Sequence, residues 1–467
     1  MELSDYSYWA QRAVKWSQNY LDNIRQRPVK SPCKPGDIYQ QIDPVPPEDA
    51  VSMEQVFKDF EDIIPDGMTH WQHPRFFAYF PANASTASMI AEQLMTTMGA
   101  QCMLWQTSPA ATELETKMVD WLRQSLGLPD GFSGVIQDSA TSATLCAVLT
   151  MRERTLAWRG IQSGLSIEAP LRVYSSDQVH SSVDKAVRVS GIGQENLIKI
   201  ATDEDYAMRA DSLRQQIRDD RAAGYLPAGI VVCTGGTSIG ASDNIKNVIE
   251  IAKAENLYVH VDAAWAGSAM ICPEFRTIWD GVEDADSIVF NPHKWLGVQF
   301  DCSIQFLAKP EEQIKSVGIR PAYLETLEAS DTIDYSEWTV PLGRRFRALK
   351  IWFMLRAYGL SSLRQRIRNH ISWAEEAASR LAKVRHLEVT SDCRFSLFTF
   401  RYNDGKSDSD IQSAKLLERI NADGRTYLTQ TTHAGNFVIR FQVGHFDCTR
   451  EDVMTAIDVV EELAGKI

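Results

Sequence analysis

The sequence lacks the features of membrane-spanning, secreted and metal-binding chains. No stretch approaches the ~20 unbroken apolar residues that a membrane helix needs. The first residues, Met1-Glu2-Leu3-Ser4-Asp5, carry acid where a secretory leader would carry basic charge and then an apolar segment. The eight cysteines include no CxxC pair, and the nine histidines show no metal-ligand spacing. We therefore expect reduced thiols in a cytoplasmic protein, without a disulfide scaffold or a metal site.

An excess of basic charge is also absent, since 61 acidic residues outnumber 48 basic ones, and this limits the expected binding partners. The formal net charge is −13, and no block of lysine and arginine occurs. Nucleic acid and anionic membrane are therefore not expected as partners, whereas a small zwitterionic substrate is compatible. With 467 residues, of which 44% are hydrophobic, the chain can bury a large core in two or three domains.

The N-terminal part, residues 1–84, is predicted to be a helical segment. Residues 4–24 read as an amphipathic helix with Ser4 as its N-cap. Its aromatic stripe fits packing against a partner subunit or against its own chain, and the sequence leaves both open. A proline-dotted connector follows, to about residue 50.

Residues 85–345 show short β-branched runs that alternate with helical patterns, which predicts an α/β domain with a mostly parallel, doubly wound sheet. The candidate strands are 134–137, 172–175, 229–233, 258–262, 287–291 and 303–307. The helical patterns between them are 142–154, 210–222 and 245–254. Residues 346–467 are predicted to form a smaller α+β domain with a helix over 347–358 and strands at 397–402 and 437–443.

Two residues at predicted strand ends suggest a cofactor. Lys294 follows an apolar strand within Phe290-Asn291-Pro292-His293-Lys294-Trp295, and Asp262 ends another strand. A lysine amine in apolar surroundings can form an imine with the aldehyde of pyridoxal phosphate, and an aspartate can keep the pyridine nitrogen protonated. Each residue alone also has an ordinary explanation, as a solvated lysine and as a turn cap, but the pair favours this cofactor.

Other segments fit the same chemistry and keep simpler alternatives. The run Asp138-Ser139-Ala140-Thr141 opens a helix, where backbone N–H groups either cradle a phosphate or are merely capped. His180 follows a strand and either stacks on a cofactor ring or serves packing. The segment 318–331 reads as a loop in which Tyr323 either delivers a proton from a lid or anchors a surface loop. Arg344, Arg345 and Arg347 fit a solvated basic face or an ion-pair network.

Seven motifs then carry a resemblance that runs nearly end to end. They are Thr69-His70-Trp71, Phe76-Phe77-Ala78-Tyr79-Phe80-Pro81, Thr112-Glu113-Leu114-Glu115-Thr116, Ser176-Asp177-Gln178-Val179-His180-Ser181-Ser182, His260-Val261-Asp262-Ala263-Ala264, Asn291-Pro292-His293-Lys294-Trp295 and Pro341-Leu342-Gly343-Arg344-Arg345-Phe346-Arg347. In these motifs the chain resembles the group II pyridoxal-phosphate-dependent decarboxylases, specifically the aromatic-L-amino-acid decarboxylases.

The resemblance implies a fold type I enzyme that acts as a homodimer with shared active sites. It implies Lys294 as the imine lysine, Asp262 as the partner of the pyridine nitrogen, His180 as the stacking residue and Tyr323 as the proton donor. The implied cofactor-binding residues also include Ala140, Thr141, Ala264, Asn291 and His293. The implied substrate residues, besides His180, are Trp71, Tyr79, Phe80, Pro81, Ala82, Met103, Leu104 and Gly343.

Departures from the family pattern and competing activities complete the expectation. Ala82 and Cys233 stand where threonine is usual, near the substrate carboxylate and near the cofactor. Plant relatives that act on indoles tend to have glycine at the position of Gly343, and those that act on phenols have serine, so the resemblance favours tryptophan slightly among tryptophan, phenylalanine, tyrosine and DOPA. Animal relatives with glycine also accept catechols. Related aldehyde synthases carry phenylalanine at the lid position, so Tyr323 favours an amine product. An aminotransferase would need a different carboxylate arrangement, and a non-enzymatic relative would fail to bind the cofactor.

Overall fold

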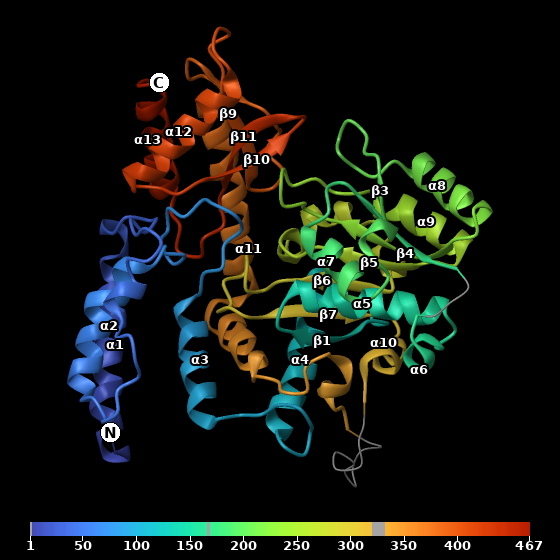
Figure 1. The fold of residues 1–467 in the computed structure, drawn as a ribbon, viewed down its shortest axis with the longest axis horizontal. Helices are drawn as coiled ribbons and strands as arrows, with labels where there is room; N and C mark the ends of the chain where they lie inside the picture. The colour runs from blue at the N-terminus through green and yellow to red at the C-terminus, as the bar shows by residue number, and fades with distance from the viewer. Residues whose placement is uncertain (1, 166–168, 320–331) are drawn as a thin grey trace. The chain divides into compact units, whose positions relative to one another are not determined.

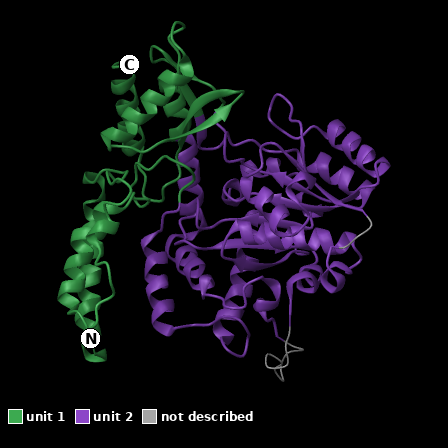
Figure 2. Ribbon diagram, viewed as in Figure 1, with its two compact units in different colours: residues 1–81, 373–392, 399–467 green, residues 82–372, 393–398 purple. Residues whose placement is uncertain are grey.

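The structure is a computed structural model that describes residues 2–165, 169–319 and 332–467 (Figure 1). The chain divides into two compact units (Figure 2). Unit 1 comprises residues 1–81, 373–392 and 399–467, and unit 2 comprises residues 82–372 and 393–398. This division joins N-terminal and C-terminal residues in one unit. The expected domains 1–84, 85–345 and 346–467 stay a prediction.

Unit 2 is built around a seven-stranded sheet with the order β1-β7-β6-β5-β4-β2-β3. Neighbouring strands are parallel from β6 to β3, whereas β7 is antiparallel to both β6 and β1. The strands are β1 (Ser133–Gln137), β2 (Leu171–Ser176), β3 (Leu197–Ile200), β4 (Leu226–Cys233), β5 (Tyr258–Asp262), β6 (Ser287–Phe290) and β7 (Ser303–Leu307). The expected α/β class with a mostly parallel sheet is confirmed.

In its described residues, unit 2 contains eight α-helices besides the first part of α11 (Arg347–Leu381). They are α3 (Thr86–Met98), α4 (Pro109–Leu126), α5 (Ala140–Thr155), α6 (Gly160–Ser163), α7 (Ser181–Val189), α8 (Ala210–Ala222), α9 (Ile245–Glu255) and α10 (Pro310–Val317). Helices α4, α5, α8 and α9 contact the sheet directly. One buried cluster joins α5 and α7 to the strands through Val148, Met151, Val173, Val187 and Val231. Burying β-branched side chains on a pleated surface is the main stabilising term here.

Unit 1 holds helices and a four-stranded sheet with the order β10-β11-β9-β8. Its helices are α1 (Tyr6–Asp22), α2 (Met53–Gly67), α12 (Ser409–Asp423) and α13 (Arg450–Ala464). The strands are β8 (Leu387–Val389), β9 (Leu397–Tyr402), β10 (Thr429–His433) and β11 (Asn436–Gln442). The long helix α11 (Arg347–Leu381) belongs to unit 2 up to residue 372 and to unit 1 from residue 373, and it is interrupted at Gly359, where φ is 70° and ψ is 155°. No helix in the described parts of the chain is long and apolar enough to cross a membrane.

The aromatic stripe of α1 packs against α2 of the same chain. The Trp9 and Phe57 rings stack with centroids 5.3 Å apart, and Trp16 meets Phe60 edge-on at 4.8 Å. Ser4 as the N-cap was wrong. A 3-10 turn, Leu3–Asp5, precedes the helix, because Asp5 accepts the Glu2 N–H at 2.9 Å and starts the turn earlier. Packing of this segment on a partner subunit stays a prediction.

Candidate functional site

The site lies where several strands of unit 2 end at one edge. Strand β1 runs in the same direction as β6, because both are antiparallel to β7. The carboxyl ends of β1, β2, β4, β5 and β6 therefore share an edge, which is where open α/β sheets bind ligands. The predicted residues Asp138–Thr141, His180, Asp262 and Asn291–Lys294 all follow or end these strands.

Main-chain hydrogen bonds fix the loop after β5 against the loop after β6. The buried Asp262 accepts the Ala264 N–H at 3.1 Å with one carboxylate oxygen. The Asn291 N–H donates to the Ala264 carbonyl at 2.9 Å, and the Lys294 N–H donates to the Asn291 carbonyl at 2.9 Å. The acid of one strand and the lysine of the next are thus held in one framework.

His180 shares this environment. Its ring caps α7, because Nδ1 accepts the Ser182 N–H at 3.1 Å. Burial lowers the pKa of His180; the charge of Asp262 opposes this, and the charge of Lys294 adds to it. The ring is therefore neutral near pH 7 and carries its proton on Nε2, because Nδ1 is an acceptor. Both charges act on this ring, so Lys294, Asp262 and His180, three of the four predicted catalytic residues, lie near one another.

His293 is a second neutral imidazole at the same edge. Burial and the neighbouring Lys294 charge lower the pKa of His293 to about 3. The Cys302 N–H donates to its Nδ1 at 2.9 Å, so the proton lies on Nε2. The side chain of Asn291 is fixed as well, because Ser303 Oγ donates to its oxygen at 2.7 Å. His293 thereby offers a fixed donor rather than a charge.

The N-terminus of α5 offers further donors. Ser139 is the N-cap, and its hydroxyl accepts the Ser142 N–H at 3.2 Å. Ala140 and Thr141 begin the helix, where backbone N–H groups have no intrahelical acceptor and the helix dipole is positive. Both residues are half-buried. This turn suits a phosphate.

The departure at Cys233 has a structural explanation. Its buried Sγ contacts the Gln178 carbonyl at 3.6 Å, on the loop that carries His180, and the Ala241 carbonyl at 3.8 Å. The next residue, Thr234, is buried, and its hydroxyl finds no hydrogen-bond partner among the described residues. A buried hydroxyl without a partner is costly, so Thr234 is the better candidate for a ligand contact.

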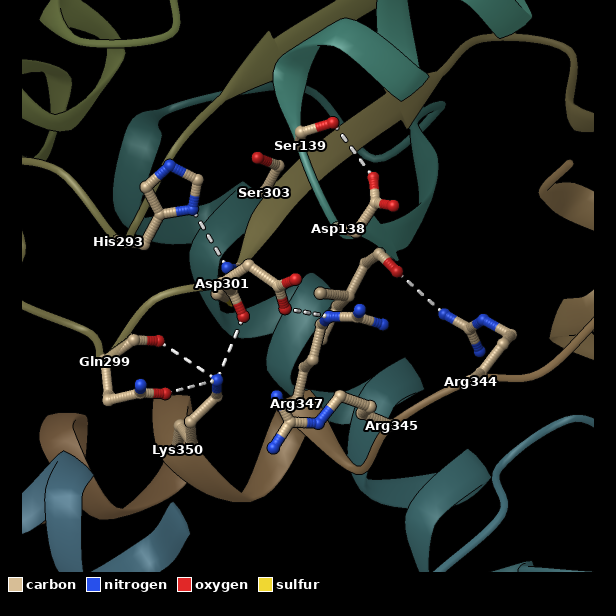
Figure 3. Close-up of polar contacts among 12 residues, drawn as sticks. Asp138, Ser139, His293, Gln299, Asp301, Ser303, Arg344, Arg345, Arg347 and Lys350 are labelled. Carbon is tan, nitrogen blue, oxygen red and sulfur yellow. Dashed lines mark hydrogen bonds and ion pairs between the residues drawn. The ribbon is translucent and has the colours of Figure 1, made fainter. Parts of the chain in front are cut away.

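The three arginines after Gly343 form ion pairs rather than a solvated basic face. Figure 3 shows the pair of Arg347 with Asp301. Arg344 is buried and donates to Glu115 at 2.6 Å. Arg347 is buried and donates to Asp301 at 2.7 Å, and Arg345 pairs with Glu92. The network also includes Lys350, which the motifs did not single out; a lysine within the run Ala348-Leu349-Lys350-Ile351 was the available signal.

The predicted substrate residues fall in both units. In unit 1, Trp71 and Tyr79 stack with ring centroids 5.7 Å apart and are partly exposed, while Phe80 and Pro81 are buried. Trp71 and Tyr79 belong to an aromatic cluster within unit 1 that also includes Phe76 and Tyr427. The role of the four predicted residues towards a substrate stays a prediction.

The remaining substrate residues belong to unit 2. The Met103 carbonyl accepts the Ser336 N–H at 3.1 Å, and Leu104 is buried. Gly343 is exposed, and a Cβ there would lie 3.2 Å from the Gln101 side chain, so a larger residue would press on Gln101. Ala82 is half-buried. Tyr323 lies outside the described residues.

The residues present fit pyridoxal phosphate. The cofactor needs an amine for its aldehyde, an acid for its ring nitrogen, a flat side chain against the ring and donors for its phosphate. Lys294, Asp262 and His180 would supply the first three groups, and the start of α5 with His293 would supply the last. The buried Thr234 hydroxyl, which has no partner among the described residues, is a further sign that a ligand completes this site.

Comparisons with known proteins agree with this chemistry. Residues 35–403 match the family described as "Pyridoxal-dependent decarboxylase conserved domain". The chain is 37% identical to the aromatic-L-amino-acid decarboxylase of Rattus norvegicus, covering 100% of this chain and 99% of that protein. It is 36% identical to the phenylacetaldehyde synthase of Arabidopsis thaliana, covering 97% and 94%. The crystal structure of Oryza sativa TDC with PLP and tryptamine superposes with a TM-score of 0.96 at 32% identity, covering 100% of this chain and 99% of that one. The chain therefore belongs to the group II pyridoxal-dependent decarboxylase family, whose cofactor is pyridoxal 5'-phosphate.

Proposed function

We propose that this chain decarboxylates an aromatic L-amino acid to the corresponding amine and CO₂. The candidates are tryptophan, phenylalanine, tyrosine and DOPA. The observation that carries the proposal is the grouping of Lys294, Asp262 and His180 at one edge of the sheet, where both charged groups act on the imidazole. The similarity to aromatic-L-amino-acid decarboxylases supports the substrate class.

Each residue has a defined task in this proposal. Bound pyridoxal phosphate supplies a ring that accepts the electron pair left when CO₂ departs. Lys294 holds the cofactor covalently, and the Asp262 carboxylate keeps the ring nitrogen protonated. His180 packs its neutral ring against the cofactor. Its Nε2–H remains available as a donor, since Nδ1 accepts the Ser182 N–H. The first turn of α5, with Asn291 and His293, binds the phosphate.

The amine product rests on Tyr323. We propose that its hydroxyl gives the proton that replaces the carboxylate on the α-carbon. In the competing aldehyde-synthase activity this position is phenylalanine, and decarboxylation is coupled to oxidative deamination, in which O₂ takes up two electrons and becomes hydrogen peroxide. The similarity to a phenylacetaldehyde synthase keeps that activity as the second candidate. We also propose that the enzyme is a homodimer with shared active sites.

Two variants test the proposal directly. Lys294→Ala should abolish both the visible absorbance of the lysine–cofactor imine and turnover, and ordinary turnover in this variant would remove the assignment. The wild type should release amine without hydrogen peroxide or ammonia, measured over a panel of the four substrates by kcat/KM. Tyr323→Phe, the matched variant, should release both by-products. Stoichiometric peroxide and ammonia from the wild type would replace the amine with the aldehyde.

A further inference from the structure

The segment that follows Lys294 is held in place by helix α3. This segment, Gly297–Cys302, links the Lys294 turn to β7. The Gly297 carbonyl accepts the Ser85 N–H at 2.7 Å, and the Gln299 N–H donates to Ser88 Oγ at 2.7 Å. These contacts fix the first half of the segment. The second half is held by a different helix.

Helix α11 holds that second half through Lys350. The side chain of Lys350 is fully buried, yet its Nζ donates to Gln299 O at 3.0 Å, to Gln299 Oε1 at 3.0 Å and to Asp301 O at 2.9 Å (Figure 3). Glu92 of α3 lies 3.1 Å from the same nitrogen and supplies the opposite charge. A buried ammonium is tolerated only with such partners, and its three donors are committed to one short segment.

Arg347, one turn earlier on α11, holds the neighbouring side chain. Its Nε donates to Asp301 Oδ1 at 2.7 Å. Two cations therefore bind Asp301: Lys350 binds its main-chain carbonyl, and Arg347 binds its carboxylate. The position of Asp301 in turn fixes where Cys302 begins.

Cys302 connects this segment to His293 through two contacts of its main-chain groups. Its carbonyl accepts the His293 N–H at 3.2 Å, and its N–H donates to His293 Nδ1 at 2.9 Å. These two contacts fix the ring orientation and the tautomer of His293, and Lys294 is the next residue along the chain.

We propose that Lys350 is a positioning residue for the cofactor site, acting through the 299–302 segment on His293 and Lys294. It does not touch the reacting atoms. Its donors fix the main chain that presents the phosphate-binding imidazole and the cofactor lysine. The inference rests on the proposed roles of Lys294 and His293.

The test is Lys350→Met, which keeps the length of the side chain and removes its three donors. We expect the dissociation constant for pyridoxal phosphate, from fluorescence titration, to rise by about tenfold or more, as for other lost supporting partners of a bound group. The visible circular dichroism of the bound cofactor should weaken, because the imine lysine is no longer fixed. The thermal shift on adding cofactor should shrink, while Tm of the cofactor-free protein falls by less.

Arg368→Met is the matched control. Arg368 lies on the same helix and pairs with Glu274 at 2.6 Å, but both side chains are exposed. It should leave cofactor affinity and dichroism at wild-type values. Gln299→Ala, which removes one of the three acceptors, should change both in the direction of Lys350→Met by a smaller factor, and it carries the test if Lys350→Met does not fold.

Wild-type cofactor affinity and dichroism in Lys350→Met, or in Gln299→Ala if only that variant folds, would overturn the inference. So would a loss of Tm that is equal with and without cofactor, since that marks a purely structural role. If Lys294→Ala retains the imine absorbance, the proposed function fails and this inference fails with it. If Lys294→Ala loses that absorbance and Lys350→Met is unchanged, only the inference fails.

Discussion

At the scale of single residues, burial decides what a charge can do. Glu115 and Arg344 are both buried, and Glu115 also accepts the Ile136 N–H at 2.9 Å, while Arg344 donates to the Ile136 carbonyl at 2.8 Å. This pair ties α4 and the segment before α11 to strand β1. A buried ion pair contributes little net free energy to stability, but removing one partner leaves the other charge buried without a counter-charge.

Glu115→Gln should therefore be strongly destabilising. We expect a loss of about 3 kcal/mol, because the buried guanidinium keeps its charge without an anion. Glu274→Gln, which breaks the exposed pair with Arg368, should cost ~1 kcal/mol or less. Urea midpoints of both variants and the wild type make the comparison. Equal shifts for the two variants would show that burial of the Glu115–Arg344 pair does not matter.

The residue scale also shows what the sequence could and could not predict about the site. Lys294 and Asp262 were singled out by a local pattern, because Asp262 ends an apolar strand and Lys294 lies four residues past another. Their roles towards a cofactor stay a prediction. Lys350 was not, because its acceptors lie 49 to 51 positions earlier and meet it only in the folded chain. For Arg344, Arg345 and Arg347 the sequence left open a solvated basic face or an ion-pair network, because their acidic partners are also distant in the sequence.

At the scale of elements, the predicted boundaries follow the strength of the local pattern. Strands β5 and β7 and helix α8 have the predicted bounds, because a continuous apolar run or a periodic apolar face stops there. Strand β3 was missed. It has four residues, includes a partly exposed pair and lies at the edge of the sheet, so it lacks a continuous apolar run.

The break in α11 permits a test at this scale. The predicted helix over 347–358 ends where Gly359 adopts φ 70° and ψ 155°, a region that only glycine enters readily. A Cβ at Gly359 would meet no atom within 4 Å, so the effect of Gly359→Ala is that of the backbone alone. We expect a loss of about 1–3 kcal/mol. Gly131→Ala, also without steric contact and without positive φ, should be neutral or stabilise by about 0.4–1 kcal/mol.

Differential scanning calorimetry of the two alanine variants separates the contributions. A fall in Tm for Gly359→Ala with little change for Gly131→Ala is expected. If Gly359→Ala matched the wild type, the helix could continue through this residue at no cost, and the break would not be a backbone requirement.

At the scale of the whole molecule, both units bury neutral imidazoles. Burial is the largest cause in each case, and it lowers the pKa of His73 in unit 1 to about 3, of His260 in unit 2 to about 4 and of His293 in unit 2 to about 3. Asp243 is the opposite case, because burial raises its pKa to about 6 although the Cys233 and Met208 N–H groups stabilise its charge.

These shifts predict how stability depends on pH. Below pH ~6.5, the ordinary pKa of histidine, these three side chains bind protons in the unfolded chain but stay neutral in the folded protein. The contribution of the buried imidazoles to the free energy of unfolding is therefore fully present above that pH. It is lost as the pH falls towards their pKa values in the folded protein. Asp243 acts in reverse, since its folded form takes up a proton as pH falls through about 6. The three histidines outweigh the one acid.

Acidification from pH 6 to pH 5 should therefore lower the free energy of unfolding. Each unmatched proton contributes ~1.4 kcal/mol per pH unit, and His260→Gln should reduce the fall by about that amount. His260 suits the substitution because it is fully buried and lies 2.8 Å from the Ser287 hydroxyl and 3.3 Å from that of Thr144, contacts that an amide can replace. Urea denaturation at pH 6 and pH 5 measures both slopes. Equal slopes in wild type and His260→Gln would mean that the buried ring takes up its proton without unfolding, and the assignment of His260 as a neutral core residue would then be wrong.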